Sequence, residues 1–285
     1  MAFTGRLVNA AAPRSPVWGR AGLVPPRAVR YLVASVTKPA TIALGIAVGG
    51  ACCATFAVAS GGVARIAWAW TAGACAVAAA SYVLNRPDWL GKRAGRLTAR
   101  ALVVLPYLVA IRIAFAIMRR WRGPDAPTLV TPGLWVGGRI EAGTFPAGVT
   151  HVVDLVAEYS APAWARALPG YRTLPILDGG PPPSPGAFLD LVRELRDVTG
   201  GVLVHCDSGR GRAPTMVAAT LVARGLAPDV VAALELVRAR RPVVTPSRSD
   251  VAFLHSVLPQ LHALRRDAGG SATGSRPSTP VRGRS

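Results

Sequence analysis

One cysteine, Cys206, lies where an apolar segment gives way to a glycine-containing loop. It follows the run at residues 202–205, and Arg212 comes six residues later. A thiol is a useful nucleophile only as its thiolate, which nearby positive charge and backbone N–H groups favour. A loop that wraps back over Cys206 and opens a helix directs such groups at one point, together with the partial positive charge of the helix N-terminus. The spacing therefore predicts a thiolate nucleophile that also binds phosphate.

The loop residues suit this chemistry. Gly209 and Gly211 allow the tight, partly left-handed backbone that such a loop needs, and the planar guanidinium of Arg212 can bind two phosphate oxygens at once. An inert buried thiol is the alternative for Cys206 alone. The preceding strand and the helix-compatible residues 213–224 favour the reactive cysteine. The predicted substrate phosphate-binding loop comprises Asp207, Ser208, Gly209, Arg210, Gly211 and Arg212.

The sequence His205-Cys206 with Arg212 six residues later resembles the His-Cys-x5-Arg loop of the protein tyrosine phosphatase superfamily, and most closely its dual-specificity branch. Residues 131–138 resemble the opening hairpin of that family, residues 149–155 its next buried strand, and Arg240-Arg241-Pro242 the end of the helix after the loop. The resemblance covers about residues 126–264. It implies a phosphatase that works through phosphocysteine without a cofactor or metal ion, with His205 orienting the loop.

A phosphatase of this kind also needs a general acid, because an alkoxide is a poor leaving group. Asp178 follows a predicted strand and precedes Gly-Gly-Pro-Pro-Pro, where dual-specificity phosphatases carry their acid. The resemblance implies that Asp178 protonates the leaving oxygen and then acts as base for the water that releases phosphocysteine. Taken by itself, Asp178 is better explained as a turn-initiating residue before two glycines; together with the Cys206 loop, the general acid is favoured.

Three positions depart from the family pattern. Ala213 replaces the Ser or Thr that helps the thiolate leave, and Thr215 is the nearby hydroxyl that could take over. Asp207 brings a carboxylate beside the nucleophile, and we expect it to point to solvent, since otherwise it would oppose both thiolate and substrate. Asp250 stands where bacterial relatives often carry a glutamine that positions water. A catalytically inactive phosphate-binding protein that recruits phosphoproteins to the membrane therefore stays a second hypothesis.

The elements around these residues define a fold class. Strands alternate with helices over residues 124–264, which predicts an α/β fold with a parallel-rich central sheet flanked by helices, the cysteine phosphatase fold. The catalytic loop then lies at the carboxyl end of the strand that ends at His205. Ser184 and Asp229 are predicted N-caps of two of the helices, and the last helix, over residues 251–261, is expected to kink at Pro259.

Charge is distributed unevenly along the chain. The formal net charge is +19, yet residues 124–264 hold as many acidic as basic residues. The excess lies in the first 123 residues and in the tail, beside apolar segments. This favours anionic lipid headgroups as partners and speaks against nucleic acid. Arginine far outnumbers lysine, which favours a GC-rich, bacterial genome.

Two segments, residues 39–64 and 66–85, contain no charged residue, and each is long enough to span a bilayer. We predict a transmembrane helical hairpin over residues 39–85, after a basic N-terminal segment at 1–38, as the α-helical membrane region of the chain. Buried soluble helices are the alternative. The remaining three cysteines fall in these spans, so neither a disulfide framework nor a zinc site is predicted.

Basic residues on both sides of the hairpin place its flanks in the cytoplasm. Residues 86–123 are predicted to form a basic loop with a re-entrant or interfacial helix, because Arg112 interrupts the apolar run 101–118; a third crossing is the alternative. The prediction is a multi-pass cell-membrane protein with a cytoplasmic catalytic domain, where Cys206 stays reduced. A disordered tail is expected at 265–285. The basic residues after the hairpin are Arg86, Lys92, Arg93, Arg96 and Arg100.

The sequence separates substrate classes only weakly. We predict a membrane-anchored phosphatase of phosphotyrosine and phosphoserine/threonine proteins. A phospholipid headgroup phosphatase, acting on phosphatidylglycerophosphate or a phosphoinositide, is the near alternative. Arg210 resembles the extra basic residue in the loop of phosphoinositide phosphatases, while Asp207 occupies another such position. The oligomeric state is not predicted.

Overall fold

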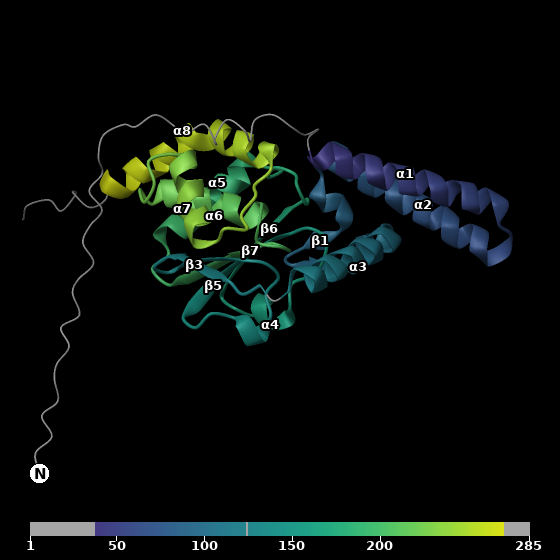
Figure 1. The fold of residues 1–285 in the computed structure, drawn as a ribbon, viewed down its shortest axis with the longest axis horizontal. Coiled ribbons are helices and arrows are strands. Elements are labelled where there is room, and N and C mark those ends of the chain that lie inside the picture. The colour runs from purple at the N-terminus through teal and green to yellow at the C-terminus, as the bar shows by residue number, and fades with distance from the viewer. Residues whose placement is uncertain (1–37, 124, 271–285) are drawn as a thin grey trace, which may run out of the picture. The chain divides into compact units, whose positions relative to one another are not determined.

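The structure is a computed structural model that describes residues 38–123 and 125–270 (Figure 1). The predictions for the basic segment before Lys38 and for residues 271–285 of the tail fall outside this part of the chain. The last helix, α8 (Arg248–Gly270), continues beyond residue 264, so the tail predicted to start at 265 begins as helix.

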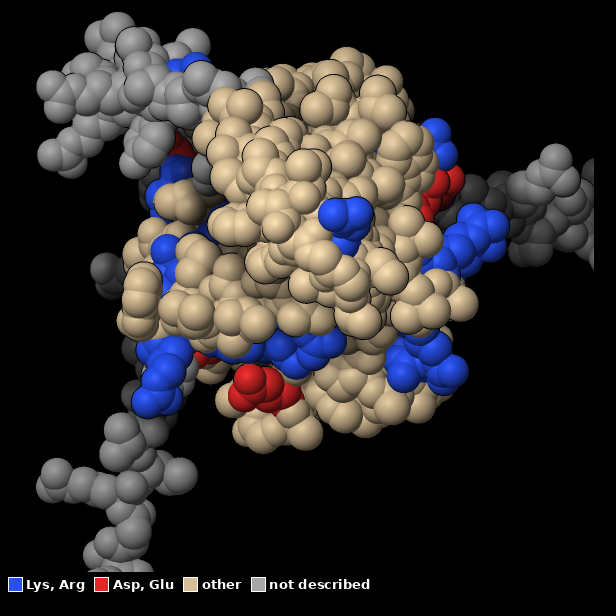
Figure 2. Space-filling view, turned by 90° about the vertical axis from the view of Figure 1, so that its right-hand side faces the viewer, with Lys and Arg blue, Asp and Glu red and all other residues tan. Residues whose placement is uncertain are grey.

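The chain begins its described part with two long apolar helices, α1 (Lys38–Ala59) and α2 (Gly62–Val83), which pack against each other. Both are long and apolar enough to cross a membrane. Their outward side chains stay exposed, among them Phe56, Val58 and Ile66. Helices that are apolar on all sides are typical of membrane spans or of the core of large proteins. The face of the molecule seen in Figure 2 is mostly uncharged, with many of its Lys and Arg side chains in a band across the lower half.

The segment after the helices is more ordered than the predicted basic loop. The sequence analysis grouped Lys92 with the basic residues expected near lipid headgroups. In the structure its side chain is buried, and its Nζ lies 2.6 Å from a carboxylate oxygen of Asp154. The physical reason is that a buried carboxylate on the sheet needs a counter-charge. The elements here are η2 (Pro87–Leu90), β1 (Lys92–Arg93), β2 (Arg96–Leu97) and η3 (Ala99–Leu102), with β1 and β2 antiparallel.

Helix α3 (Leu105–Arg122) follows, with Pro106 in its first turn, where the missing N–H is not needed. Three arginines, Arg119, Arg120 and Arg122, occupy its last turn, where their charge favours the helix dipole. The re-entrant or interfacial position of this helix, with a third crossing as the alternative, stays a prediction.

A five-stranded sheet in the order β3-β4-β7-β5-β6 forms the centre of the domain. Strand β3 is antiparallel to β4, and the other neighbours are parallel. This confirms the predicted parallel-rich α/β fold. The strands are β3 (Thr128–Thr131), β4 (Leu134–Gly137), β5 (Val149–Val156), β6 (Gly170–Ile176) and β7 (Gly201–His205).

Four helices cover one face of the sheet and enclose the main core (Figure 1). Ser184 and Asp229 cap two of them as predicted, each accepting a backbone N–H, and α8 runs through Pro259. The other face packs against Trp164 and Leu168. The four helices are α5 (Pro185–Asp197), α6 (Arg212–Ala223), α7 (Val230–Arg240) and α8. Two shorter helical elements, α4 (Ala163–Arg166) and η4 (Ala142–Thr144), lie elsewhere in the domain sequence.

Strand β7 lies between β4 and β5, and its carboxyl end leads through residues 206–211 directly into α6. Every residue of α6 is buried. The loop is therefore fixed by a central strand on one side and a central helix on the other.

Candidate active site

The loop that follows β7 turns back over its first residue. Cys206 is 2% exposed, and its Sγ accepts a hydrogen bond from the backbone N–H of Gly209 at 3.2 Å. Gly209 has a φ of +64°, and a Cβ at this position would lie 2.6 Å from the carbonyl carbon of Gly137. Only glycine fits there without strain. The N-terminus of α6 begins at Arg212, so its partial positive charge faces the loop.

Arg212 is buried, and one of its terminal nitrogens is held by neighbouring groups. Its Nη1 donates to Oε2 of Glu158 at 2.9 Å and to the carbonyl oxygen of Ile176 at 2.7 Å. Its Nη2 lies 3.3 Å from Oδ1 of Asp178. Burial opposes the charge of Arg212, but Glu158, Asp178 and the Cys206 thiol outweigh it and raise the pKa of the guanidinium. The arginine is thus a fixed cation beside the thiol.

Glu158 is a site residue that the sequence analysis missed. It lies just after β5, is fully buried, and accepts backbone N–H groups from Ala157 and Asp178 in addition to the guanidinium of Arg212. The carboxylate fixes the arginine from behind and also ties the loop that carries Asp178. The only signal in the sequence was an acidic residue directly after an apolar strand.

Asp178 lies beside Arg212, at the end of the phosphate-binding loop. It follows β6, and its side chain is partly exposed beside Arg212. The two line a cavity of about 310 Å³ at the mouth of the loop, to which α1 and α3 also contribute side chains. The further lining residues are Ile42, Met118, Arg122, Gly179, Ser208, Arg210, Gly211, Thr245, Ser247 and Asp250.

The expectation that Asp207 points to solvent is wrong. Its side chain is 7% exposed and accepts a hydrogen bond from the Tyr159 hydroxyl at 3.1 Å. Arg119 of α3 lies 3.9 Å away on the same carboxylate oxygen. These partners come from distant segments, and they compensate the carboxylate that would otherwise repel an anionic substrate.

Thr215 does not replace the hydroxyl missing at Ala213. Its Oγ1 donates to the carbonyl oxygen of Gly211 at 2.9 Å, one turn back along α6. Asp250 lies at the start of α8, where Oδ2 accepts from the N–H and hydroxyl of Ser247. Its Oδ1 is buried and makes no hydrogen bond with any described residue, and burial raises the pKa of this carboxyl.

His205 supports the loop from below. Burial lowers the pKa of its imidazole, and Nε2 lies 3.7 Å from Oδ1 of Asp154. The same aspartate accepts from Lys92 at 2.6 Å and from the Tyr171 hydroxyl at 2.7 Å. A polar cluster therefore anchors the end of β7.

Arg241, in the segment that resembles the arginine-proline of the family, holds the loop from the other side. Its Nε donates to the carbonyl oxygen of Gly209, and its Nη1 to Thr128 on β3. Its Nη2 pairs with Asp125. The guanidinium thus joins the top of the loop to the chain that enters the sheet.

Within residues 38–123 and 125–270, no group of three or more His, Cys, Asp or Glu side chains is arranged to hold a metal ion. The chemistry available from the described side chains is nucleophilic attack by a thiolate, proton transfer by a carboxylic acid, and anion binding by a guanidinium and backbone N–H groups.

Comparison with known proteins gives a domain match for part of the chain. A family model described as the DSP-PTPase phosphatase domain of the Swiss Army Knife protein, PTP-SAK, matches residues 140–266. No curated protein matches the chain.

Three solved structures illustrate the likeness. Human DUSP28 is 24% identical over 49% of this chain and 97% of its own, with a TM-score of 0.39. PTPMT1 in complex with PI(5)P is 18% identical over 52% of this chain and 100% of its own, with a TM-score of 0.41. Human tyrosine phosphatase-like serine/threonine/tyrosine-interacting protein is 23% identical over 47% of this chain and 95% of its own, with a TM-score of 0.39. The family model, by itself, identifies residues 140–266 as similar to a phosphatase domain of the dual-specificity (DSP-PTPase) type.

Proposed function

We propose that the protein is a membrane-anchored, cysteine-dependent phosphatase that hydrolyses phosphate monoesters through a phosphocysteine intermediate. One observation carries the proposal: Arg212 and Asp178 line one cavity, and the thiol of Cys206 begins the loop that leads into Arg212. These are the three groups that the reaction needs.

In the first step the Cys206 thiolate attacks phosphorus, an S–P bond forms and the P–O bond to the leaving group breaks. Asp178, protonated, gives its proton to the leaving oxygen. Arg212 and the loop N–H groups bind the non-bridging phosphoryl oxygens, where charge develops. Because Glu158 already orients Arg212, little reorganisation is needed when substrate binds.

In the second step water attacks phosphorus, Asp178 takes its proton, and the thiolate leaves with both electrons of the S–P bond. Ala213 offers no hydroxyl to the departing sulfur, and that of Thr215 is bound to Gly211. We therefore propose that release of phosphocysteine is the slower step.

The two apolar helices support a membrane anchor. We propose that α1 and α2 form a hairpin in the cell membrane, with the phosphatase domain in the cytoplasm and basic residues at anionic headgroups. Anchoring raises the local concentration of membrane phosphoproteins and of phospholipids alike.

The test is hydrolysis of a small aryl phosphate by the full chain in detergent. We expect turnover that is abolished in Cys206→Ser. Cys75→Ser, which changes a cysteine in α2, is the matched control and should keep the activity. Wild-type protein that binds phosphate but shows no turnover would instead identify the inactive phosphate-binding adaptor.

A further inference from the structure

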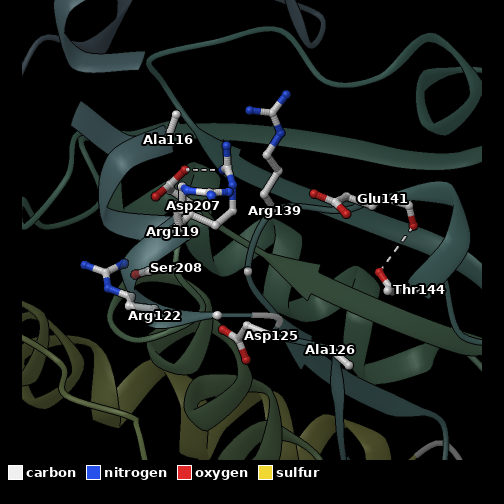
Figure 3. A pocket seen from close by; sticks show the side chains of 13 residues that line it. Ala116, Arg119, Arg122, Asp125, Ala126, Arg139, Glu141, Thr144, Asp207 and Ser208 are labelled. Atoms are coloured by element: carbon white, nitrogen blue, oxygen red, sulfur yellow. Dashed lines mark hydrogen bonds and ion pairs between the residues drawn. The ribbon is translucent and has the colours of Figure 1, made fainter. Parts of the chain in front are cut away.

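A second cavity, of about 480 Å³, borders the phosphate-binding loop on the side of α3 (Figure 3). We call it the arginine pocket. Asp207 and Ser208 of the loop line it, and its four arginines come from two elements: three from the last turn of α3 and one from the segment after β4. The arginines are Arg119, Arg120, Arg122 and Arg139.

The carboxylates around the arginine pocket do not neutralise it. Of its acidic residues, Asp125 is already paired with Arg241, which lies outside the lining. Asp207 accepts from Tyr159 and lies 3.9 Å from Arg119, so it offsets at most that one arginine. The third acidic residue, Glu141, makes no ion pair with any described residue, so it offsets none of the four guanidinium groups by direct pairing. The pocket therefore has an excess of positive charge.

The guanidinium groups themselves are left with unused donors. Nη1 of Arg119 is buried and makes no hydrogen bond within the described chain; its nearest carboxylate oxygen, on Asp207, is 3.9 Å away. The guanidinium of Arg139 lies over the ring of Tyr159, 5.0 Å from its centre, and pairs with no carboxylate among the described residues. Buried donors without acceptors are costly, so an anion entering the pocket is stabilised.

The arginine pocket and the catalytic cavity adjoin each other. Arg122 and Ser208 line both. A substrate whose phosphate monoester occupies the loop can thus place a second anionic group among the arginines.

We propose that the arginine pocket is a subsite for a second phosphate of the substrate, and that this substrate is a phospholipid whose headgroup carries a phosphate monoester in addition to its phosphodiester. The inference rests on the proposed phosphatase function and names its substrate class. The α3 arginines and Arg139 precede the residues that the family model matches, which start at residue 140, so the family match by itself does not imply this subsite.

The surroundings favour a lipid over a phosphopeptide. Helix α3 exposes Val109, Ile113, Ile117 and Trp121, spaced by four residues along one side of the helix. An exposed apolar stripe ending in arginines is typical of helices that lie at the headgroup level of a bilayer. Ile42 of the membrane-type helix α1 lines the catalytic cavity itself. The pocket is thus placed where a lipid phosphodiester would lie.

The experiment compares substrates that differ by one phosphate, using the full chain. Phosphatidylglycerophosphate, with a monoester and a diester, is compared with phosphatidic acid in detergent micelles. Their water-soluble counterparts, glycerophosphoglycerol phosphate and glycerol 3-phosphate, remove the acyl chains. We expect kcat/KM to be at least about tenfold higher for the two-phosphate member of each pair, as one charge-assisted contact predicts.

The double variant Arg122→Gln/Arg139→Gln should lower that preference about tenfold. Arg96→Gln/Arg100→Gln is the matched control, since it removes the same charge from exposed residues that line neither cavity, and it should keep the preference. Equal rates on both members of each pair, with an aryl phosphate still hydrolysed, would overturn the subsite and leave the phosphatase function intact. Loss of aryl phosphate hydrolysis as well would overturn the function itself. A preference for a doubly phosphorylated peptide over both lipids would overturn the lipid assignment.

Discussion

Arg212 is oriented before any substrate arrives. Its guanidinium is held by Glu158 and by the carbonyl oxygen of Ile176, which leaves Nη2 facing Asp178 and the cavity. A planar cation fixed in this way loses little entropy when it binds phosphate. The geometry of the guanidinium, beyond its charge, is therefore part of the catalytic apparatus that we propose.

Replacing Arg212 with lysine tests this directly. Arg212→Lys keeps the charge but loses the fork that meets Glu158 and phosphate together, so we expect kcat/KM for an aryl phosphate to fall about 100-fold or more. Arg193→Lys on α5, an exposed arginine paired with Asp190, is the control and should retain the wild-type rate. Near-normal activity of Arg212→Lys would contradict the bidentate role.

Asp154 makes the stability of the protein depend on pH. Burial opposes its ionisation, but the facing His205 and Lys92 outweigh burial and hold the pKa of Asp154 below its usual range. A pKa lowered by folding adds stability above the unfolded value, about 3.9, and that stability is lost as pH falls through the folded value. The melting temperature of wild type should thus fall more steeply below about pH 4 than that of Asp154→Asn. Parallel curves for the two proteins would disprove the assignment.

The site residues that could be predicted from the sequence are those that lie close together in it. Cys206 and Arg212 are six residues apart, so their spacing alone indicates that both side chains lie at one loop. Glu158 lies 54 residues from Arg212, and no local pattern indicates their contact. Asp207 was misjudged for the same reason, because its partners Arg119 and Tyr159 come from elsewhere in the chain.

The short strand β1 connects the segment after the hairpin to the catalytic sheet. Lys92 on β1 and Asp154 on β5 are both buried, with side chains at most 1% exposed. Breaking a buried ion pair leaves one charge without compensation. The segment that follows the apolar helices is thus fastened to the strand next to β7.

Removing that contact should loosen the segment. Lys92→Met is expected to destabilise the protein by about 3–5 kcal/mol, with faster amide exchange over residues 86–104, while Lys92→Met/Asp154→Leu should recover part of the loss because no charge stays buried. Denaturant unfolding and hydrogen exchange measure the two effects. Unchanged exchange over residues 86–104 in Lys92→Met would show that the segment is held by other contacts.

The elements were predictable to different degrees. Caps at Ser184 and Asp229 and the alternation of strands and helices are local signals, and the structure has the corresponding elements. The segment that forms the hairpin β1–β2 was predicted only to be a basic loop, because strands of two residues leave no periodic pattern in the sequence. The strand order that puts β7 at the centre depends on long-range packing, which no single segment contains.

The helices before the family domain take part in the candidate site. Ile42 of α1 and Met118 and Arg122 of α3 line the cavity that also holds Asp178 and Arg212. A phosphatase domain cut from the chain at its family boundary would lack this wall. Activity is therefore best measured on the full chain, with α1 and α2 inserted in lipid or detergent.

Trapping the covalent intermediate tests the account most directly. Full-length protein in liposomes is mixed with an aryl phosphate, quenched in acid within one turnover, digested and analysed by mass spectrometry. Because release of the thiolate lacks a nearby hydroxyl, we predict a phosphoryl group on Cys206 at a substantial fraction of sites, and none in Cys206→Ser. Hydrolysis of the substrate with no phosphate on Cys206, or with equal turnover by Cys206→Ser, would contradict the proposed chemistry.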